Sequence, residues 1–431
     1  MRILKTGEPE FEAYLAELER RGGHEDLRLE RKVRSILNDV SRRGDDALLH
    51  YTRALDGVKI SVEQLQVKKW EIANAYQKVP AKFARTLGKA ARRIRTFHER
   101  MGKRLIGSWE VKERGIRLVQ RVKPLERVGI YVPGGKASYP STVLMAGIPA
   151  KVAGVQEVFM VTPPQPEGGI SPAVLVAASL IGIDRIYRVG GVQAIGALTF
   201  GTPSIPRVDK IVGPGNRYVA TAKRLVFGLV DIDMVAGPSE IVIVSDEKTP
   251  SSWVAADLIS QAEHDEMALA VLITPSERMA IQVAAEIKKQ LFSLRRRKIA
   301  EASLKRRGAI LIVRDVKQAI TMANRIAPEH LELCLSHPRA FVKEIKHAGA
   351  VFLGCHTPEA IGDYLAGPNH ILPTAGTARF SSPLGVEDFL KRVNLLEFDG
   401  PALGRFEKDV KQFAEWEGLE GHYQAVRVRK E

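Results

Sequence analysis

The sequence predicts an α/β protein whose centre consists of two lobes, each with a mainly parallel sheet covered by helices on both faces. Three observations lead to this prediction. From Arg127 onward, short apolar runs of strand length alternate with longer runs of helix length, which is the pattern of βαβ units. The strand-like runs are too many for one small unit. Several of them end in glycine-rich loops, which gather where open α/β sheets bind ligands.

The expected strands are eight short runs, most of them rich in valine and isoleucine. They are VGIYV (128–132), EVFMVT (157–162), RIYRVG (185–190), DKIVG (209–213), EIVIVS (240–245), LAVLIT (269–274), AILIVR (309–314) and AVFLG (350–354). Helices are expected between them, notably at Ala173–Ile181, Ala194–Phe200, Arg217–Phe227, Ser252–Ala262 and Arg278–Leu291. The order of these elements predicts parallel neighbours joined by helical crossovers.

The chain before and after this region has a different pattern. Amphipathic runs predict that the first 106 residues are helical, and residues 111–121 alternate like a hairpin that turns at Glu113–Gly115. The sequence becomes irregular after Pro373, and a highly charged tail follows. The expected organisation is an N-terminal helical region with the hairpin (1–126), a first lobe (127–238), a second lobe (239–380) and a C-terminal tail (381–431).

Composition and charge exclude several classes of protein. Hydrophobic residues make up 45% of the 431 residues and charged residues 27%, so the chain is neither disordered nor collagen-like. The net charge is +15, and residues 1–125 carry 29 Lys and Arg against 17 Asp and Glu. This basic excess raises the alternative of nucleic-acid binding. However, the basic segment Lys82–Arg104 also has the apolar spacing of an amphipathic helix with a solvated face, and no RNA-binding or helix-turn-helix motif accompanies it.

The cysteines and the N-terminus favour a cytoplasmic protein. Cys334 and Cys355 are the only cysteines, and they give neither a disulfide framework nor a zinc-finger or iron–sulfur spacing. No stretch has the pattern of a signal peptide or the length of a membrane-spanning helix.

Three glycine-rich loops follow strands, at residues 132–138, 189–197 and 212–218. None is a dinucleotide fingerprint, because Tyr218 stands where the third glycine of the last loop belongs. The first is not a P-loop either, since Ile130 and Ala137 replace its glycine and hydroxyl residue. Each loop alone is ordinary turn chemistry. Together they favour a ligand cleft at the carboxyl ends of these strands.

Several nitrogen and oxygen side chains suit a zinc site that contains no thiolate. Gln261 and His264 are three residues apart at the end of an expected helix and therefore share a face. Asp363 and His370 follow in one short segment, and His422 lies in the tail. Spacing alone does not distinguish these residues from ordinary surface polar groups.

The segment NRIAPEHLEL (324–333) contains an adjacent carboxylate and imidazole. Pro328 should end the preceding helix at Ala327. In an extended chain, Glu329 and His330 would point to opposite faces and could serve two separate proton transfers. The alternative is an ordinary helix end with a packed histidine. Ser239, just before an expected strand, could face a ligand or simply begin the strand.

Nine motifs in one order resemble the histidinol dehydrogenase family, from about residue 27 to the C-terminus. They are IYVPGGKASYPSTVLM, GVQAIGALTFGT, DKIVGPGNRYV, DMVAGPSEIVI, DLISQAEHD, NRIAPEHLEL, GAVFLG, GDYLAGPNHILPTAGTARFSSPLGVEDFLK and EGLEGHYQAVRVR. The resemblance implies two incomplete Rossmann-like lobes, similar to those of aldehyde dehydrogenases, with N-terminal helices that could pack on the second lobe. It implies a homodimer in which the C-terminal tail swaps across to the partner's active site. It also implies one zinc per site and two NAD per turnover, in a cytoplasmic enzyme of histidine biosynthesis.

The resemblance assigns expected roles to individual residues. The expected zinc ligands are Gln261, His264, Asp363 and, from the other subunit, His422. The expected acid–base pair is Glu329 and His330. The expected substrate contacts are Ser239, His370 and Glu417, together with the zinc ligands and His330. The expected NAD contacts are Tyr131, Gln193 and Asn216.

The reaction that the resemblance implies is oxidation of L-histidinol through L-histidinal to L-histidine. His330 would accept the alcohol proton, and Glu329 would activate the water that adds to the aldehyde. Three alternatives remain from the sequence. They are a dehydrogenase of the same scaffold acting on another alcohol, a zinc hydrolase, and a basic nucleic-acid-binding protein without catalysis. The hydrolase is disfavoured because the chain has no HExxH motif.

Overall fold

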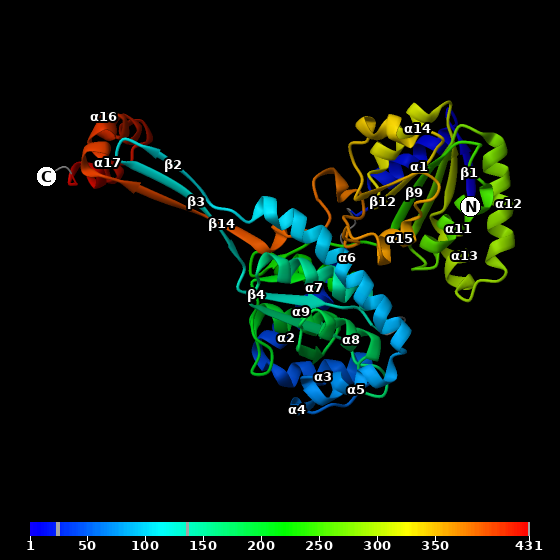
Figure 1. Ribbon diagram of the computed structural model, residues 1–431, viewed down its shortest axis with the longest axis horizontal. Helices are drawn as coiled ribbons and strands as arrows, with labels where there is room; N and C mark the ends of the chain where they lie inside the picture. Colours follow the sequence, from blue (N-terminus) through cyan, green and yellow to red (C-terminus); the bar gives the residue numbers. More distant parts are fainter. Residues whose placement is uncertain (23–25, 135–137, 430–431) are drawn as a thin grey trace.

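The computed structural model describes residues 1–22, 26–134 and 138–429 of the chain. It contains two α/β lobes and a long arm that projects from the first lobe and carries the C-terminal helices at its tip (Figure 1). Part of the first glycine-rich loop, including Ala137 of the P-loop comparison, lies outside the described residues. Among the described residues, no helix is long and apolar enough to cross a membrane.

The first lobe contains a five-stranded parallel sheet in the order β6-β5-β4-β7-β8. Its strands are β4 (Arg127–Tyr131), β5 (Glu157–Thr162), β6 (Arg185–Arg188), β7 (Lys210–Val212) and β8 (Asp231–Ile232). The connecting helices are α7 (Pro140–Ala153), α8 (Pro172–Leu180), α9 (Gly191–Phe200) and α10 (Arg217–Val226). The central strands are buried on both faces, which explains their continuous apolar sequences. Four of the predicted strands and the crossover helices are confirmed here, while the two-residue strand β8 was not predicted.

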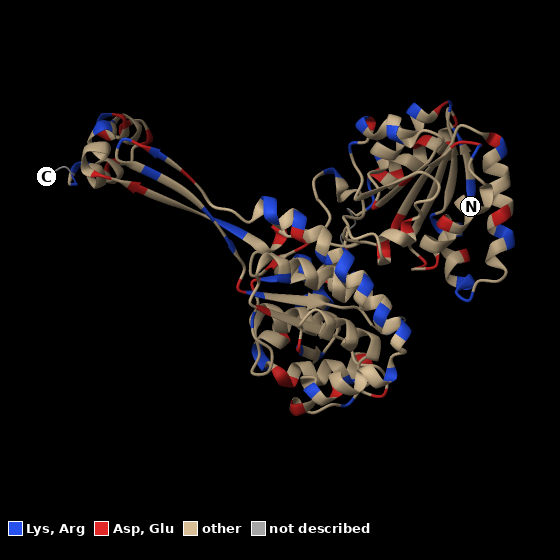
Figure 2. Cartoon of the chain, in the orientation of Figure 1, with Lys and Arg blue, Asp and Glu red and all other residues tan. Residues whose placement is uncertain are grey.

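Five N-terminal helices cover the first lobe. They are α2 (Leu27–Arg43), α3 (Asp45–Asp56), α4 (Val62–Leu65), α5 (Lys69–Lys78) and α6 (Ala81–Leu105). Val33 and Val40 of α2 share a core with α9, and Leu87 and Ile94 of α6 share a core with α7. The predicted basic helix is confirmed as α6, along which Lys and Arg residues recur (Figure 2), most of them exposed.

The second lobe contains a six-stranded parallel sheet in the order β1-β11-β10-β9-β12-β13. Its strands are β1 (Arg2–Lys5), β9 (Glu240–Ser245), β10 (Leu269–Thr274), β11 (Ala309–Ile312), β12 (His330–Cys334) and β13 (Ala350–Leu353). Its helices are α1 (Pro9–Glu19), α11 (Ser251–Ala262), α12 (Glu277–Leu291), α13 (Arg297–Arg306), α14 (Val316–Ile326) and α15 (Glu359–Tyr364), with short 3₁₀ helices at Pro338–Glu344, Thr377–Arg379 and Glu387–Phe389. The second lobe therefore combines the N-terminal elements β1 and α1 with elements that follow the first lobe in the sequence.

Two sequence predictions are wrong in the N-terminal region. Residues Arg2–Lys5 are not helical, because they form β1 and pair in parallel with β11; four residues are too few for a strand period to be recognised. The N-terminal helices do not all pack on the second lobe. Only α1 does so, through Phe11, Leu15 and Leu18, whereas α2–α6 pack on the first lobe.

The arm is a three-stranded antiparallel sheet in the order β14-β3-β2. It consists of β2 (Trp109–Glu113), β3 (Ile116–Pro124) and β14 (Leu390–Phe398), and it leads to α16 (Gly400–Glu417) and α17 (Glu420–Arg427). The predicted hairpin is confirmed, with Gly115 at a φ of 79° in its turn. Many of the arm's large apolar side chains are exposed, among them Val111, Val393, Leu395, Leu396, Phe413 and Trp416.

Candidate active site

The helix before Glu329 ends where the proline predicts. Helix α14 stops at Ile326, and Ala327 adopts a left-handed conformation with a φ of 49°. This conformation costs an alanine roughly 1–2 kcal/mol. It turns the chain sharply, so that His330 begins β12 with its side chain buried. The turn therefore delivers Glu329 and His330 to the amino edge of the second sheet.

Both side chains bind the backbone of Glu240, the first residue of the neighbouring strand β9. The Glu240 N–H donates to Glu329 Oε2 at 2.8 Å, and His330 Nδ1 lies 2.9 Å from the Glu240 carbonyl oxygen. A carbonyl oxygen only accepts hydrogen bonds, so Nδ1 carries the proton and Nε2 keeps a lone pair. His330 therefore presents a base to the site.

The prediction that Glu329 and His330 point to opposite faces is wrong. His330 Nδ1 lies 3.7 Å from Glu329 Oε2. Side-chain alternation applies within a strand, and Glu329 precedes β12 in the turn that Ala327 begins. The two groups thus share one buried site.

Burial shifts the protonation of this pair. It raises the pKa of the Glu329 carboxyl well above its usual range. The hydrogen bond from the Glu240 backbone lowers this pKa, whereas nearby carboxylates, including that of Glu240, raise it further. Burial lowers the pKa of the His330 imidazole, although the charge of Asp363 opposes this shift. Neutral imidazole is therefore the resting form at neutral pH, as a proton acceptor requires.

The predicted metal ligands of the second lobe come together beside this pair. Helix α11 runs back from the carboxyl edge of the sheet and brings Gln261 and His264 to the amino edge. Metal-binding atoms of His264 and Asp363 lie within 4.8 Å of one another, together with a carboxylate oxygen of Glu359. Gln261 is fully buried, yet its Oε1 and Nε2 have no hydrogen-bond partner among the described residues. A buried amide without partners is costly, and a cation bound to Gln261 Oε1 together with the His264 and Asp363 ligand atoms would give this oxygen a partner.

Glu359 is a member of this site that the sequence reasoning missed. Its Oε1 is buried without a hydrogen-bond partner in the described part of the chain and lies 3.9 Å from His330 Nε2. Burial raises the pKa of the Glu359 carboxyl, and the charge of Asp363 adds to the rise. The signal was available, because Glu359 and Asp363 are four residues apart on one helix and so share a face.

His370 and Ser239 lie at the margin of the site. His370 Nδ1 is 3.0 Å from the Asp363 carbonyl oxygen, which fixes the ring beside that predicted ligand. Ser239 is half-buried and directly precedes Glu240, and its carbonyl oxygen accepts from the Leu269 N–H. Both residues can therefore face a small molecule held at the amino edge.

Glu417 and His422 do not join this site within one chain. Both are exposed on the helices at the tip of the arm, which Figure 1 shows far from α11 and α15. Trp416 beside them is 92% exposed. A role for these two residues in this site would therefore require a second copy of the chain.

The residues expected to contact NAD line the carboxyl edge of the first sheet. The Tyr131 hydroxyl, at the end of β4, accepts from the Gly191 N–H at 3.2 Å. Gln193, in the first turn of α9, has a buried Oε1 without a partner among the residues that the structure describes. Asn216 caps α10 by accepting from the N–H groups of Tyr218 and Val219. The glycine loop before Asn216 passes so close to β4 that a side chain at Gly213 would clash with the Tyr131 carbonyl oxygen.

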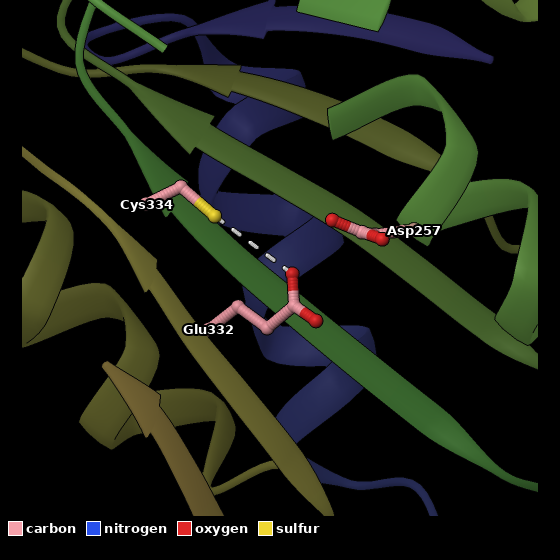
Figure 3. Close-up of side chains that lie close together, drawn as sticks. All are labelled: Asp257, Glu332 and Cys334. Carbon is pink, nitrogen blue, oxygen red and sulfur yellow. Dashed lines mark hydrogen bonds between the residues drawn. The ribbon is translucent and has the colours of Figure 1, made fainter. Parts of the chain in front are cut away.

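Asp257, Glu332 and Cys334 form a second cluster (Figure 3), which contacts the site through Glu359. Glu332 Oε1 accepts from the Glu359 N–H at 2.6 Å, and its other oxygen lies 3.9 Å from Cys334 Sγ. Burial raises the pKa of all three groups. Metal ligands must be deprotonated, and burial disfavours the deprotonated form of each group, so the cluster is better suited to joining α11, β12 and α15 than to holding a cation.

Comparison with known proteins gives a consistent result. Residues 19–430 match the model of the histidinol dehydrogenase family. The chain is 51% identical to histidinol dehydrogenase from Geobacter sulfurreducens over 431 residues, covering 100% of both chains, and 50% identical to that from Syntrophotalea carbinolica over 430 residues, covering 100% of this chain and 99% of the other. The crystal structure of histidinol dehydrogenase from Elizabethkingia anophelis matches with a TM-score of 0.91 and 35% identity, covering 100% of this chain and 98% of that one.

Proposed function

Because the chain belongs to the histidinol dehydrogenase family, an oxidoreductase family of the final steps of histidine biosynthesis, we propose that the site at the amino edge of the second sheet performs both oxidations. L-Histidinol would be converted through L-histidinal to L-histidine, with zinc and NAD as cofactors. The observation that carries this proposal is the buried pair of Glu329 and His330 beside the unpartnered amide of Gln261 and the group of His264 and Asp363.

The side chains present fit a zinc ion. Gln261, His264 and Asp363 would hold it from one chain, and His422 from a second copy would complete the set. Bound zinc supplies a fixed point of attachment for the substrate's imidazole and amine nitrogens. Ser239 and His370 would contact the substrate from the same chain, and Glu417 of the second copy would pair with its amine.

The first lobe supplies groups that fit NAD. Gln193 has an unpartnered buried oxygen, and Tyr131 and Asn216 stand with it at the carboxyl ends of the strands, where such ligands bind. NAD held by these groups would supply the hydride acceptor for each of the two oxidations. Segment 365–389 connects the two lobes, since the Asn369 amide donates to the Met145 carbonyl oxygen of α7 at 2.7 Å.

His330 and Glu329 have separate tasks in the chemistry. His330 Nε2 accepts the proton of the substrate hydroxyl, and Nδ1 stays bound to the Glu240 carbonyl oxygen, which keeps the ring oriented. Glu329 accepts a proton from the water that adds to the aldehyde. Its raised pKa makes the carboxylate a stronger base than an exposed one. As the water adds, His330 returns the proton that it took from the alcohol to the aldehyde oxygen, which completes the hydrate and restores the neutral imidazole. His330 then accepts the hydroxyl proton of the hydrate in the second oxidation.

The exposed apolar surface of the arm supports a homodimer. Leu396, Phe413 and Trp416 are each at least 70% exposed, and apolar side chains in this number mark an interface. If the arm packs on a second copy, its tip brings Glu417 and His422 to the partner's site. The two cysteines are free thiols, one buried and one half-buried, which supports a reducing cytoplasmic location.

The first experiment measures NADH formation with L-histidinol before chelation, after chelation and after zinc is returned. The expected result is two NADH per histidinol, lost on chelation and restored by zinc. A folded, zinc-loaded enzyme that forms no NADH from histidinol but oxidises another alcohol would support the alternative substrate. A salt-dependent shift of nucleic acid without any oxidation would support the nucleic-acid alternative.

A further inference from the structure

Arg21, two residues after the end of α1, forms a buried ion pair with Glu240 of β9. Arg21 Nε donates to Oε1 at 2.6 Å and Nη2 donates to Oε2 at 2.8 Å, with the two side chains 6% and 3% exposed. Two parallel bonds fix the guanidinium against the carboxylate in one orientation. The pair therefore attaches the N-terminal segment to the first residue of the strand beside the active site.

The same guanidinium also holds the turn that leads to Glu329. Arg21 Nη2 donates to the Ile326 carbonyl oxygen at 2.8 Å, at the end of α14. The next residue, Ala327, has the left-handed φ of 49° that alanine rarely adopts. Such a conformation persists only where its surroundings fix it, and the bond from Arg21 is one of the contacts that do so.

Arg21 thus acts on both supports of the catalytic pair. The backbone of Glu240 binds Glu329 Oε2 through its N–H and His330 Nδ1 through its carbonyl oxygen. The side chain of the same Glu240 is clamped by Arg21. The turn at Ile326 and Ala327 sets the position of the Glu329 backbone.

We propose that Arg21 is a positioning residue for the reaction, which sets the orientation of Glu329 and His330 through Glu240 and through the turn after α14. The proposal rests on the function proposed above. A misplacement of about 1 Å at a reacting group can lower the rate about 100-fold. Loss of Arg21 should therefore reduce turnover while leaving the zinc ligands of α11 and α15 in place.

Arg325 offers a matched control. It joins α14 to α1 as Arg21 does, through ion pairs to Glu19 at 2.8 Å and Glu12 at 3.1 Å. Its side chain is 32% exposed, and none of its side-chain bonds within the described residues reaches Glu240 or the turn. Loss of Arg325 removes contacts between the same two helices without disturbing the catalytic pair.

The test compares Arg21→Met and Arg325→Met in the full-length, zinc-loaded enzyme. We expect Arg21→Met to lower kcat about 10- to 100-fold, with the KM for histidinol and the bound zinc within about twofold of the parent enzyme. Arg325→Met should keep kcat within about twofold. Equal values of kcat in the two variants would overturn the proposal.

A second variant guards against a failure to fold, since Arg21→Met leaves Glu240 buried and unpaired. The double variant Arg21→Met/Glu240→Gln removes that charge and keeps the backbone bonds of residue 240. We expect its thermal stability to recover while kcat stays low. Normal kcat in a stable double variant would contradict a positioning role, and so would failure of both variants to fold while Arg325→Met folds.

His330→Asn, measured in parallel, separates this inference from the function on which it rests. Normal turnover in His330→Asn would contradict the proposed function itself. Impaired turnover in His330→Asn, together with normal turnover in Arg21→Met, would contradict only the role of Arg21.

Discussion

At the scale of single residues, the chemistry depends on how burial changes the pKa of the neighbouring Glu329 carboxyl and His330 imidazole. Removal from water favours the neutral form of each group, so it raises the pKa of Glu329 and lowers that of His330. The same environment therefore makes one residue a strong base once ionised and keeps the other ready to accept a proton.

Replacement of His330 by asparagine should affect turnover most. Asparagine keeps a donor toward the Glu240 carbonyl oxygen but has no basic nitrogen, and loss of general base catalysis costs about 10²- to 10⁴-fold. Steady-state rates with L-histidinol should show this loss in kcat, with KM changed far less. Turnover close to that of the parent enzyme would exclude His330 as the base.

Replacement of Glu329 by glutamine should separate the two oxidations. The glutamine side chain of this variant would retain the hydrogen bond from the Glu240 N–H but could not accept a proton from water. We expect oxidation of L-histidinal to fall much further than oxidation of L-histidinol. The two half-reactions can be measured separately by rapid mixing with each substrate, and equal losses would contradict the water-activating role.

The sequence suggested candidate site residues only where a known motif contained them. The spacing of Gln261 and His264 was suggestive but not decisive, and the resemblance supplied their expected role. Glu359 and Arg21 were missed for different reasons. Glu359 shares a helix face with Asp363, so its signal was local, whereas Arg21 meets Glu240 across a distance in the chain that no local pattern records.

At the level of elements, Glu332 connects three pieces of the proposed active site. It lies on β12, accepts from the first residue of α15 and hydrogen-bonds to Asp257 of α11. These elements carry His330, Asp363 and the pair of Gln261 and His264. A buried carboxyl thus fixes their relative positions.

Glu332→Gln should change how stability depends on pH. The folded-state pKa of Glu332 is raised by burial, so the folded protein retains a proton that the unfolded chain loses above about pH 4.3. The stability that this proton provides is complete below that value and declines as pH rises toward the raised pKa. The glutamine variant lacks this decline, so it should gain stability relative to the parent enzyme between about pH 5 and about pH 8.

Urea unfolding at several pH values would measure this difference. Glu332→Leu is the control, because it also removes the charge but cannot accept from the Glu359 N–H, and it should be less stable than Glu332→Gln at every pH. Parallel stability curves for the parent enzyme and Glu332→Gln would contradict the raised pKa.

Strands with long apolar runs were predicted, whereas a strand whose apolar run is interrupted by functional residues was missed. The run EIVIVS became β9 with every residue buried. The run HLELC was not predicted as a strand, although it forms β12 and is also fully buried. His330 and Glu332 break its apolar pattern, and departures of this kind are expected at functional sites. Strand β14 was missed because nearly all of its residues are exposed.

At the level of the whole molecule, a shared active site can be tested by complementation. His422→Ala should weaken zinc retention, and His330→Asn should abolish the base, so each variant alone should be nearly inactive. If the tail serves the partner, a mixed dimer contains one site with both changes and one site with neither. Random mixing in equal amounts should then restore about a quarter of the parent activity.

The mixed dimer gives a clear contrary result. If His422 served its own subunit, both sites of the mixed dimer would remain defective and no activity would return. Co-expression with two affinity tags isolates the mixed dimer for this measurement. Recovery of activity would also demonstrate the oligomeric state directly.

The general architecture could be predicted from the sequence, but the arm could not. Alternation of strands and helices is a local pattern, and it predicted two parallel-rich lobes. The separation of β1 and α1 from the helices that follow them, and the projection of the arm, depend on contacts between distant segments. No periodicity in a single stretch encodes them.

The central strand of the arm has a consequence for the order of folding. Strand β3 pairs on one side with β2, its neighbour in sequence, and on the other with β14, where Ile116 lies opposite Phe398 and Pro124 opposite Leu390. During synthesis the hairpin of β2 and β3 emerges early, while β14 leaves the ribosome only after both lobes. Until then β3 has an open edge, which is prone to pair with other chains. Completion of the arm is therefore a late step, and the nascent enzyme passes through a stage in which this edge needs protection from aggregation.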